Sequence, residues 1–139
     1  MEEKSKREQA FCYIYSQEIQ KQNNSEQVKL FLDSEQIKDN RTIEYVKEIA
    51  NGIKENEKDI TDMISKNLKS GWTIDRISTI DVALLKLAIY EIIYKKMPYK
   101  IVINEVVNYA KMYGEENSGS FINGVLASII KTETISSEE

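Results

Sequence analysis

The sequence predicts an all-α protein, and three observations support this fold class. Apolar residues recur at steps of three, four or seven positions over most of the chain, as in helices that bury one face. Period-two alternation, which is typical of half-buried strands, is nowhere sustained. The single proline, Pro98, and glycines such as Gly71 and Gly114 fall between the apolar stretches and act as boundaries. A length of 139 residues suits one compact domain.

The first half of the chain predicts three or four helices. A helix over residues 6–20 presents an apolar face, a polar connector covers 20–25, and a short helix begins at Ser25. From 42 to 68 the apolar positions form one face of one long helix or of two consecutive helices. Glu57 interrupts this apolar row, which predicts a kink or break within 56–59. Gly71 closes this half because glycine tolerates a positive φ at a helix end.

The second half predicts three further helices. The first begins near Ser78 or Thr79, ends near Lys96 and is apolar on nearly every side, which favours a central buried position. Pro98 prevents its continuation. The next helix is capped by Gly114, and the last opens at Ser118 or Ser120. Residues 132–139 are polar and acidic and predict a loose tail.

Composition restricts the class of partner and the compartment. The formal net charge is −4, so nucleic acid would have to bind to a local patch of positive charge. The single cysteine cannot form an intramolecular disulfide, which favours the cytoplasm. No signal peptide is recognisable, and no uninterrupted apolar stretch is long enough to predict a membrane span.

Catalytic chemistry finds little support in the sequence. Histidine, the commonest general base and metal ligand, is absent. Cys12 lies in an aromatic-rich helix and is predicted to be a core residue. No glycine-rich phosphate loop is present, and carboxylates four residues from lysines are typical of solvated helix pairs. We therefore predict that the protein is not an enzyme and needs neither a metal nor a cofactor.

Three sequence blocks occur in a fixed order in the second half. They are W-T-I-D-R-I-S-T-I-D-V-A-L-L-K-L-A-I-Y-E from Trp72, P-Y-K-I-V-I-N-E-V-V-N-Y-A-K from Pro98, and F-I-N-G-V-L from Phe121. Each block alone is a common helical pattern, but their order and spacing together resemble the NusB family. A weaker match earlier in the chain consists of Arg7, Ala10 and Tyr15.

This resemblance implies a fold and a function. The fold would comprise two small helical-bundle subdomains, over about residues 1–70 and about 71–131. The function would be transcription antitermination, notably on ribosomal RNA operons. The factor would pair with NusE, a small-subunit ribosomal protein, bind a boxA element in nascent RNA, and join RNA polymerase.

The resemblance also assigns site residues. RNA contacts would come from the N-terminal arm and from the region around the start of the last helix, at Lys4, Lys6, Arg7, Lys111, Asn117, Ser118 and Phe121. NusE contacts would fall on the first helix and on an exposed edge of the central helix, at Tyr15, Asp81, Lys86 and Glu91. The arm departs from the arginine-rich arm of the family, because Glu2, Glu3 and Glu8 offset its cations. We therefore expect weak RNA binding by the chain alone.

Several residues have two interpretations. The arm cations could be a solvated helix start, and Phe121, at the margin of its helix's apolar stripe, could be core or a platform for a base. We expect Trp72 to anchor the two subdomains and Gly124 to allow close helix packing.

The function also has alternatives. NusB-like domains accompany ribosomal RNA methyltransferases, but no cofactor-binding region follows here. The other alternative is a non-catalytic helical interaction scaffold, alone or as a homodimer, with weak or lost RNA binding.

Overall fold

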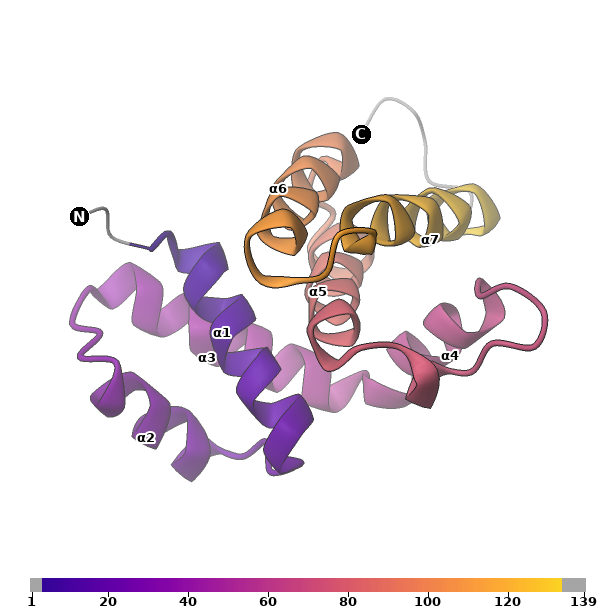
Figure 1. Ribbon diagram of the computed structural model, residues 1–139. Coiled ribbons are helices and arrows are strands. Elements are labelled where there is room, and N and C mark those ends of the chain that lie inside the picture. Colours follow the sequence, from indigo (N-terminus) through magenta and orange to yellow (C-terminus); the bar gives the residue numbers. More distant parts are fainter. Residues whose placement is uncertain (1–3, 134–139) are drawn as a thin grey trace.

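The computed structural model describes residues 4–133, which form seven α-helices, two short helical turns and no strand (Figure 1). The helices are α1 (Lys6–Gln20), α2 (Ser25–Ser34), α3 (Asn40–Glu55), α4 (Glu57–Lys66), α5 (Thr79–Ile89), α6 (Tyr99–Tyr113) and α7 (Ser118–Thr132). A 3₁₀ turn, η1 (Ile74–Arg76), precedes α5, and a π-helical turn, η2 (Tyr90–Tyr94), extends it. The all-α prediction is confirmed.

Side-chain caps determine where the first three helices begin. The hydroxyl of Ser5 accepts a hydrogen bond from the backbone N–H of Glu8 at 3.1 Å. Asn24 and Asp39 cap α2 and α3 in the same way, which satisfies backbone donors that have no partner inside the helix. The predicted break near residue 56 is present, and there the side-chain amide of Asn56 donates to the carbonyl of Gly52 at 2.8 Å.

Helix α5 is the centre of the molecule. Every residue from Asp81 to Ile89 is buried, as its nearly all-round apolar sequence predicts. Helices α1 and α3 pack on one side of it, and α6 and α7 on another (Figure 1). Because α5 contacts both groups, it joins them through a continuous core.

Three expectations about single residues need correction. Gly71 has the predicted positive φ of 88°, but α4 ends at Lys66, so this glycine lies in the following loop. Trp72 is 53% exposed and does not anchor two bundles. Gly124 is exposed, and a Cβ added there would meet no atom within 4 Å, so close helix packing does not explain it.

Two further predictions concern segments. Of the tail expected over residues 132–139, Thr132 is the last residue of α7 and residues 134–139 lie outside the described part of the chain. Within residues 4–133, no helix is both long enough and apolar enough to span a bilayer.

Candidate functional site

The N-terminal arm places two of its predicted RNA-binding cations at the surface. Lys4 and Lys6 are exposed, and the ammonium of Lys6 lies 4.8 Å from the centre of the Tyr45 ring. The ammonium of Lys4 lies 3.8 Å from the sulfur of Cys12. Neither lysine forms an ion pair within the described chain. Both can therefore neutralise a phosphate without breaking an ion pair of the described chain.

Arg7 is engaged differently from the two lysines. Its Nε lies 2.7 Å from Oε1 of Glu91, and its side chain is only 15% exposed. Glu91 is fully buried and also accepts a hydrogen bond from the hydroxyl of Tyr45. Burial raises the pKa of Glu91, while the charge of Arg7 opposes that rise. The surface positions expected for Arg7 and Glu91 are therefore wrong, because the two residues form an internal joint between α1 and η2.

Lys86 also lies inside the protein. Its ammonium lies 2.5 Å from a carboxylate oxygen of Glu18 and 2.7 Å from one of Glu57, and its side chain is 6% exposed. Burial alone would lower the pKa of Lys86, but hydrogen bonds and charge from these two glutamates raise it overall. The exposed edge expected at Lys86 is absent, because this lysine ties α5 to α1 and to α4.

Asp81 and Tyr15 are the other two predicted partner contacts. Asp81 was expected to be exposed at the start of the central helix, but it is only 7% exposed. Its backbone N–H donates to the hydroxyl of Ser78 at 3.2 Å, and burial raises the pKa of its carboxyl group. Tyr15 is half-buried and stacks on Phe11, with ring centroids 6.1 Å apart. Part of the Tyr15 ring remains available to a partner.

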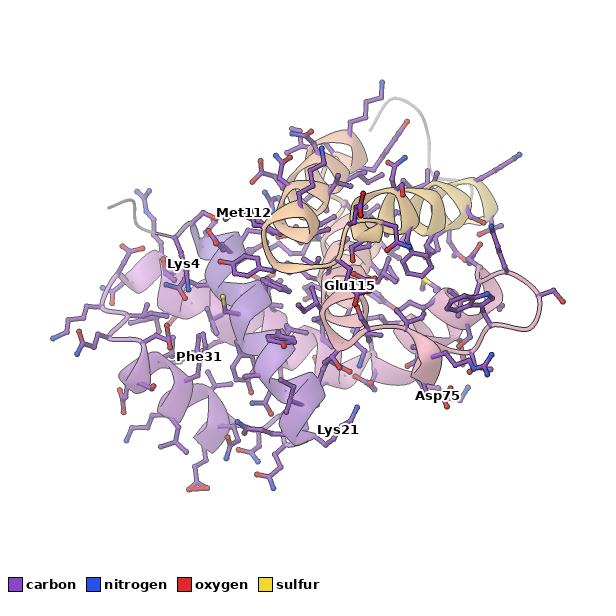
Figure 2. The ribbon with its side chains drawn as sticks, in the orientation of Figure 1. Lys4, Lys21, Phe31, Asp75, Met112 and Glu115 are labelled. Atoms are coloured by element: carbon purple, nitrogen blue, oxygen red, sulfur yellow. The ribbon has the colours of Figure 1, made fainter. Side chains whose placement is uncertain are left out.

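Contacts between α1 and α6 bring the arm close to the second predicted RNA region. The hydroxyls of Ser5 and Tyr109 are hydrogen-bonded at 3.1 Å, and the hydroxyl of Tyr113 donates to a carboxylate oxygen of Glu8. Figure 2 shows Lys4 on the same side of the molecule as Met112, near the end of α6. The arm therefore lies against the last turns of α6.

The start of α7 continues this surface. Lys111 on α6 is exposed, and its Cε would lie 3.8 Å from a Cβ added at Gly119. Asn117 is exposed and Phe121 is half-buried. Ser118, in contrast, is 1% exposed, and its hydroxyl accepts a hydrogen bond from the backbone N–H of Glu115 at 3.0 Å. The RNA contact predicted for Ser118 does not fit this position, since the side chain holds the turn that precedes α7.

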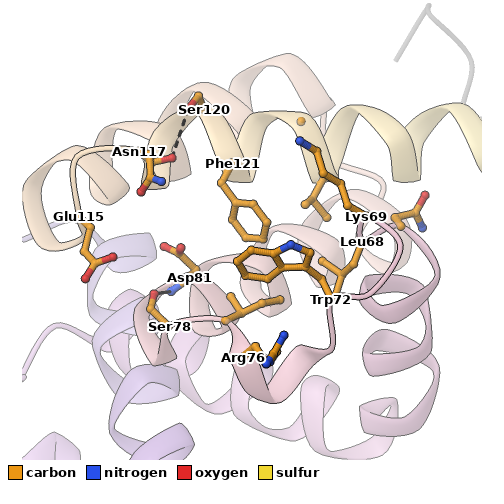
Figure 3. Close-up of a pocket in the computed structure, with 14 residues that line it drawn as sticks. Leu68, Lys69, Trp72, Arg76, Ser78, Asp81, Glu115, Asn117, Ser120 and Phe121 are labelled. Atoms are coloured by element: carbon orange, nitrogen blue, oxygen red, sulfur yellow. Dashed lines mark hydrogen bonds between the residues drawn. The ribbon is translucent and has the colours of Figure 1, made fainter.

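A cavity of about 630 Å³ opens beside Phe121 (Figure 3). Phe121 points from α7 toward the indole of Trp72, which belongs to the loop between α4 and α5. Arg76 and Asn117 also line the cavity. Two segments far apart in sequence therefore form one site, with aromatic walls and polar groups around them.

Sequence reasoning missed several members of this cavity. Lys69, Trp72, Arg76 and Gly124 line it together with Phe121. The one sequence feature that could have indicated the cavity is Gly124, because a glycine inside a helix lowers its stability and therefore needs another explanation. Spacing alone cannot show whether a missing side chain makes room for another helix or for an open cavity.

The arrangement defines a class of protein. Lysines of α6 and of the N-terminal arm are exposed, aromatic rings of α7 and the α4–α5 loop line the cavity, and residues 4–133 contain no cluster of three or more potential metal ligands. These features are those of an all-helical binding protein, with side chains suited to contacting nucleic acid.

The chain belongs to the NusB family, whose family model matches residues 4–131. It is 39% identical to the transcription antitermination protein NusB of Acetivibrio thermocellus, over 99% of this chain and 94% of the relative. It is 38% identical to the protein of the same name in Ruminiclostridium cellulolyticum, over 94% of this chain and 90% of the relative.

Solved structures agree with this membership. T. maritima NusB matches with a TM-score of 0.80 at 31% identity, over 94% of this chain and 93% of that chain. A chain in the crystal structure of the antitermination factors NusB and NusE in complex with dsRNA matches with a TM-score of 0.83 at 29% identity, over 91% of this chain and 94% of that chain. The family is one of non-catalytic transcription factors, in agreement with the prediction that the chain is not an enzyme.

Proposed function

We propose that this chain is a transcription antitermination factor that binds single-stranded boxA-type RNA together with NusE. The complex would join RNA polymerase and support elongation, notably on ribosomal RNA operons, in the cytoplasm. The observation that carries this proposal is the match over 91% of the chain to a structure in which NusB and NusE occur together with double-stranded RNA.

The distribution of charge and aromatic groups supports the RNA component. With a net charge of −4, the molecule as a whole does not attract RNA. Lys4, Lys6 and Lys111 are nevertheless exposed, and Phe121 and Trp72 line the cavity beside α7. Proteins recognise single-stranded RNA by combining such cations with aromatic rings on which bases stack.

The partner surface is a separate proposal. Tyr15 is a half-buried residue of α1, whereas Asp81 is buried at the start of α5. Lys86 and Glu91 would affect the affinity for NusE only indirectly, because their ion pairs hold α1 against α5 and η2. We therefore expect NusE affinity to depend on the Tyr15 side chain.

An electrophoretic mobility shift tests the function. Labelled boxA RNA and a scrambled RNA of equal composition are titrated with the chain alone, NusE alone and both proteins. We expect a specific shift that requires both proteins, and a Tyr15→Ala variant that forms the ternary complex only at higher concentration. The alternative of a helical scaffold, alone or as a homodimer, would instead give NusE binding without any RNA shift.

A further inference from the structure

The cavity beside α7 has a size and a lining suited to a small planar group. Its volume of about 630 Å³ lies within the ~300–1,000 Å³ typical of ligand pockets. Phe121 and Trp72 face it from two segments (Figure 3). Trp72 is 53% exposed although most large apolar side chains of the protein are buried, so its position is not explained by the core.

Charge is unevenly distributed around this cavity. Asp81 and Glu115 lie at one end, while Lys69 and Arg76 lie toward the other (Figure 3). Oδ1 of Asp81 is buried and accepts no hydrogen bond within the described structure, although the hydroxyls of Ser118 and Ser78 lie close enough to the carboxyl group to oppose the rise of its pKa. A carboxylate oxygen without a donor is costly, which favours a ligand that brings N–H groups to this end.

Gly124 keeps the cavity open. It lines the cavity from α7, and a Cβ built there would meet nothing within 4 Å. The backbone conformation of this glycine is helical and does not require glycine. The missing side chain therefore makes room beside Phe121.

We propose that this cavity binds one nucleotide of single-stranded RNA and selects a base that carries an exocyclic amino group. The base lies between Phe121 and Trp72, its amino edge faces Asp81 and Glu115, and its phosphate lies toward Lys69 and Arg76. The inference rests on the proposed RNA-binding function and adds its base specificity.

Base chemistry gives the expected preference. Adenine and cytosine present amino donors at N6 and N4, which a carboxylate can accept. Uracil presents the O4 acceptor instead, so its oxygen would face carboxylates and be repelled. The acidic end thus discriminates against uracil, while the aromatic walls are indifferent to the base.

Fluorescence of Trp72 tests the preference directly, because it is the single tryptophan of the chain. The full chain at low salt is titrated with short oligoadenylate, oligocytidylate and oligouridylate. We expect adenine and cytosine to quench Trp72 at concentrations about tenfold lower than uracil, since one well-placed polar contact discriminates by about that factor. Glu115→Gln should narrow this difference, and equal quenching by all three homopolymers would overturn the inference.

A blocking variant separates this cavity from the rest of the RNA surface. Gly124→Leu should fill the cavity and lower the RNA affinity of the complex with NusE by about tenfold, as loss of base stacking does. Ala127→Leu is the matched control, because Ala127 is an exposed residue of α7 that does not line the cavity. Both variants should keep the NusE affinity of the unmodified chain, and neither should melt at a lower temperature than the unmodified chain.

The remaining outcomes are distinct. If the Gly124→Leu complex keeps full RNA affinity, the cavity inference fails while the proposed function stands. If Gly124→Leu weakens NusE binding in the absence of RNA, the cavity accepts a protein side chain and the inference also fails. If the unmodified chain with NusE does not bind boxA RNA, both the function and the cavity inference fail.

Discussion

At the scale of single residues, the ion pair between Arg7 and Glu91 joins the start of α1 to the end of the central helix. Its Nε–Oε1 distance is 2.7 Å and Glu91 has no exposed surface. Removing one partner of a buried pair leaves a charge without compensation, which costs more than the pair itself contributes.

Arg7→Leu should therefore lower the free energy of unfolding by about 3 kcal/mol. The double variant Arg7→Leu/Glu91→Leu should recover much of this loss, because it leaves no uncompensated charge. Urea denaturation of the single variant, the double variant and the unmodified chain measures both effects. A single variant as stable as the unmodified chain would show that the pair has no structural role.

Asp81 makes the stability of the protein depend on pH. Burial raises the pKa of its carboxyl group above the ordinary value of 3.8. A raised carboxyl pKa means that the folded state holds the proton more tightly, so this group stabilises the fold below pH 3.8 and the contribution is lost as pH rises through the folded pKa. Asp81→Asn should thus gain stability relative to the unmodified chain on going from about pH 4 to about pH 7. The measurement is the urea midpoint of both proteins at the two pH values. A difference in midpoint between the variant and the unmodified chain that does not change with pH would contradict this prediction.

Phe121 has a different expected role from that of the core residues beside it. Phe121→Ala should lower the boxA affinity of the complex with NusE by about tenfold, or about 1.4 kcal/mol, at the low end of base-stacking energies. Leu126 is 1% exposed, so Leu126→Ala truncates the core and should cost about 2–5 kcal/mol of stability. Phe121 is half-buried, so the thermal stability of Phe121→Ala should fall less than that of Leu126→Ala. Equal melting losses for the two variants would place Phe121 in the core.

At the scale of elements, close contact between α3 and η2 depends on one glycine. A Cβ added at Gly52 would overlap the ring of Tyr90, which itself stacks on Tyr94 with ring centroids 5.6 Å apart. The π-helical turn thus packs against α3 at a position where a larger residue would displace the Tyr90 ring.

Gly52→Ala should therefore destabilise the protein by about 1–3 kcal/mol, as overpacked core substitutions do. Gly124→Ala is the matched control, since the added Cβ meets open space and should stabilise α7 by up to about 1 kcal/mol. Combining Gly52→Ala with Tyr90→Leu should reduce the loss, because the shorter side chain frees the space. Thermal denaturation of the three variants provides the measurement.

At the scale of the whole molecule, net negative charge opposes RNA while a local surface attracts it. We expect weak binding by the chain alone and tight binding with NusE, because each protein then increases the affinity of the other for RNA.

The salt dependence of the complex tests this surface. Each phosphate neutralised on a single strand contributes a slope of about 0.7 in log affinity against log salt. Lys4→Ala/Lys6→Ala should reduce the slope by about 1.4 in total, since neither ammonium group forms an ion pair within residues 4–133. Lys29→Ala, an exposed lysine on α2, should leave the slope unchanged. An unchanged slope in the double variant would remove the arm from the RNA surface.

The helices could be predicted from the sequence alone, because the signals that define each helix are local. Apolar spacing, the caps at Ser5 and Ser78, and the stop at Pro98 all act within a few residues along the chain. The resemblance of three ordered blocks also predicted the family correctly.

Which polar residues are buried depends on how the helices pack against one another. Arg7, Lys86 and Glu91 look like surface charges in sequence, but partners 29 to 84 positions away enclose them. The cavity of Trp72, Phe121 and Gly124 likewise arises where the α4–α5 loop meets α7. No local rule specifies such contacts, because they depend on how all helices pack around α5.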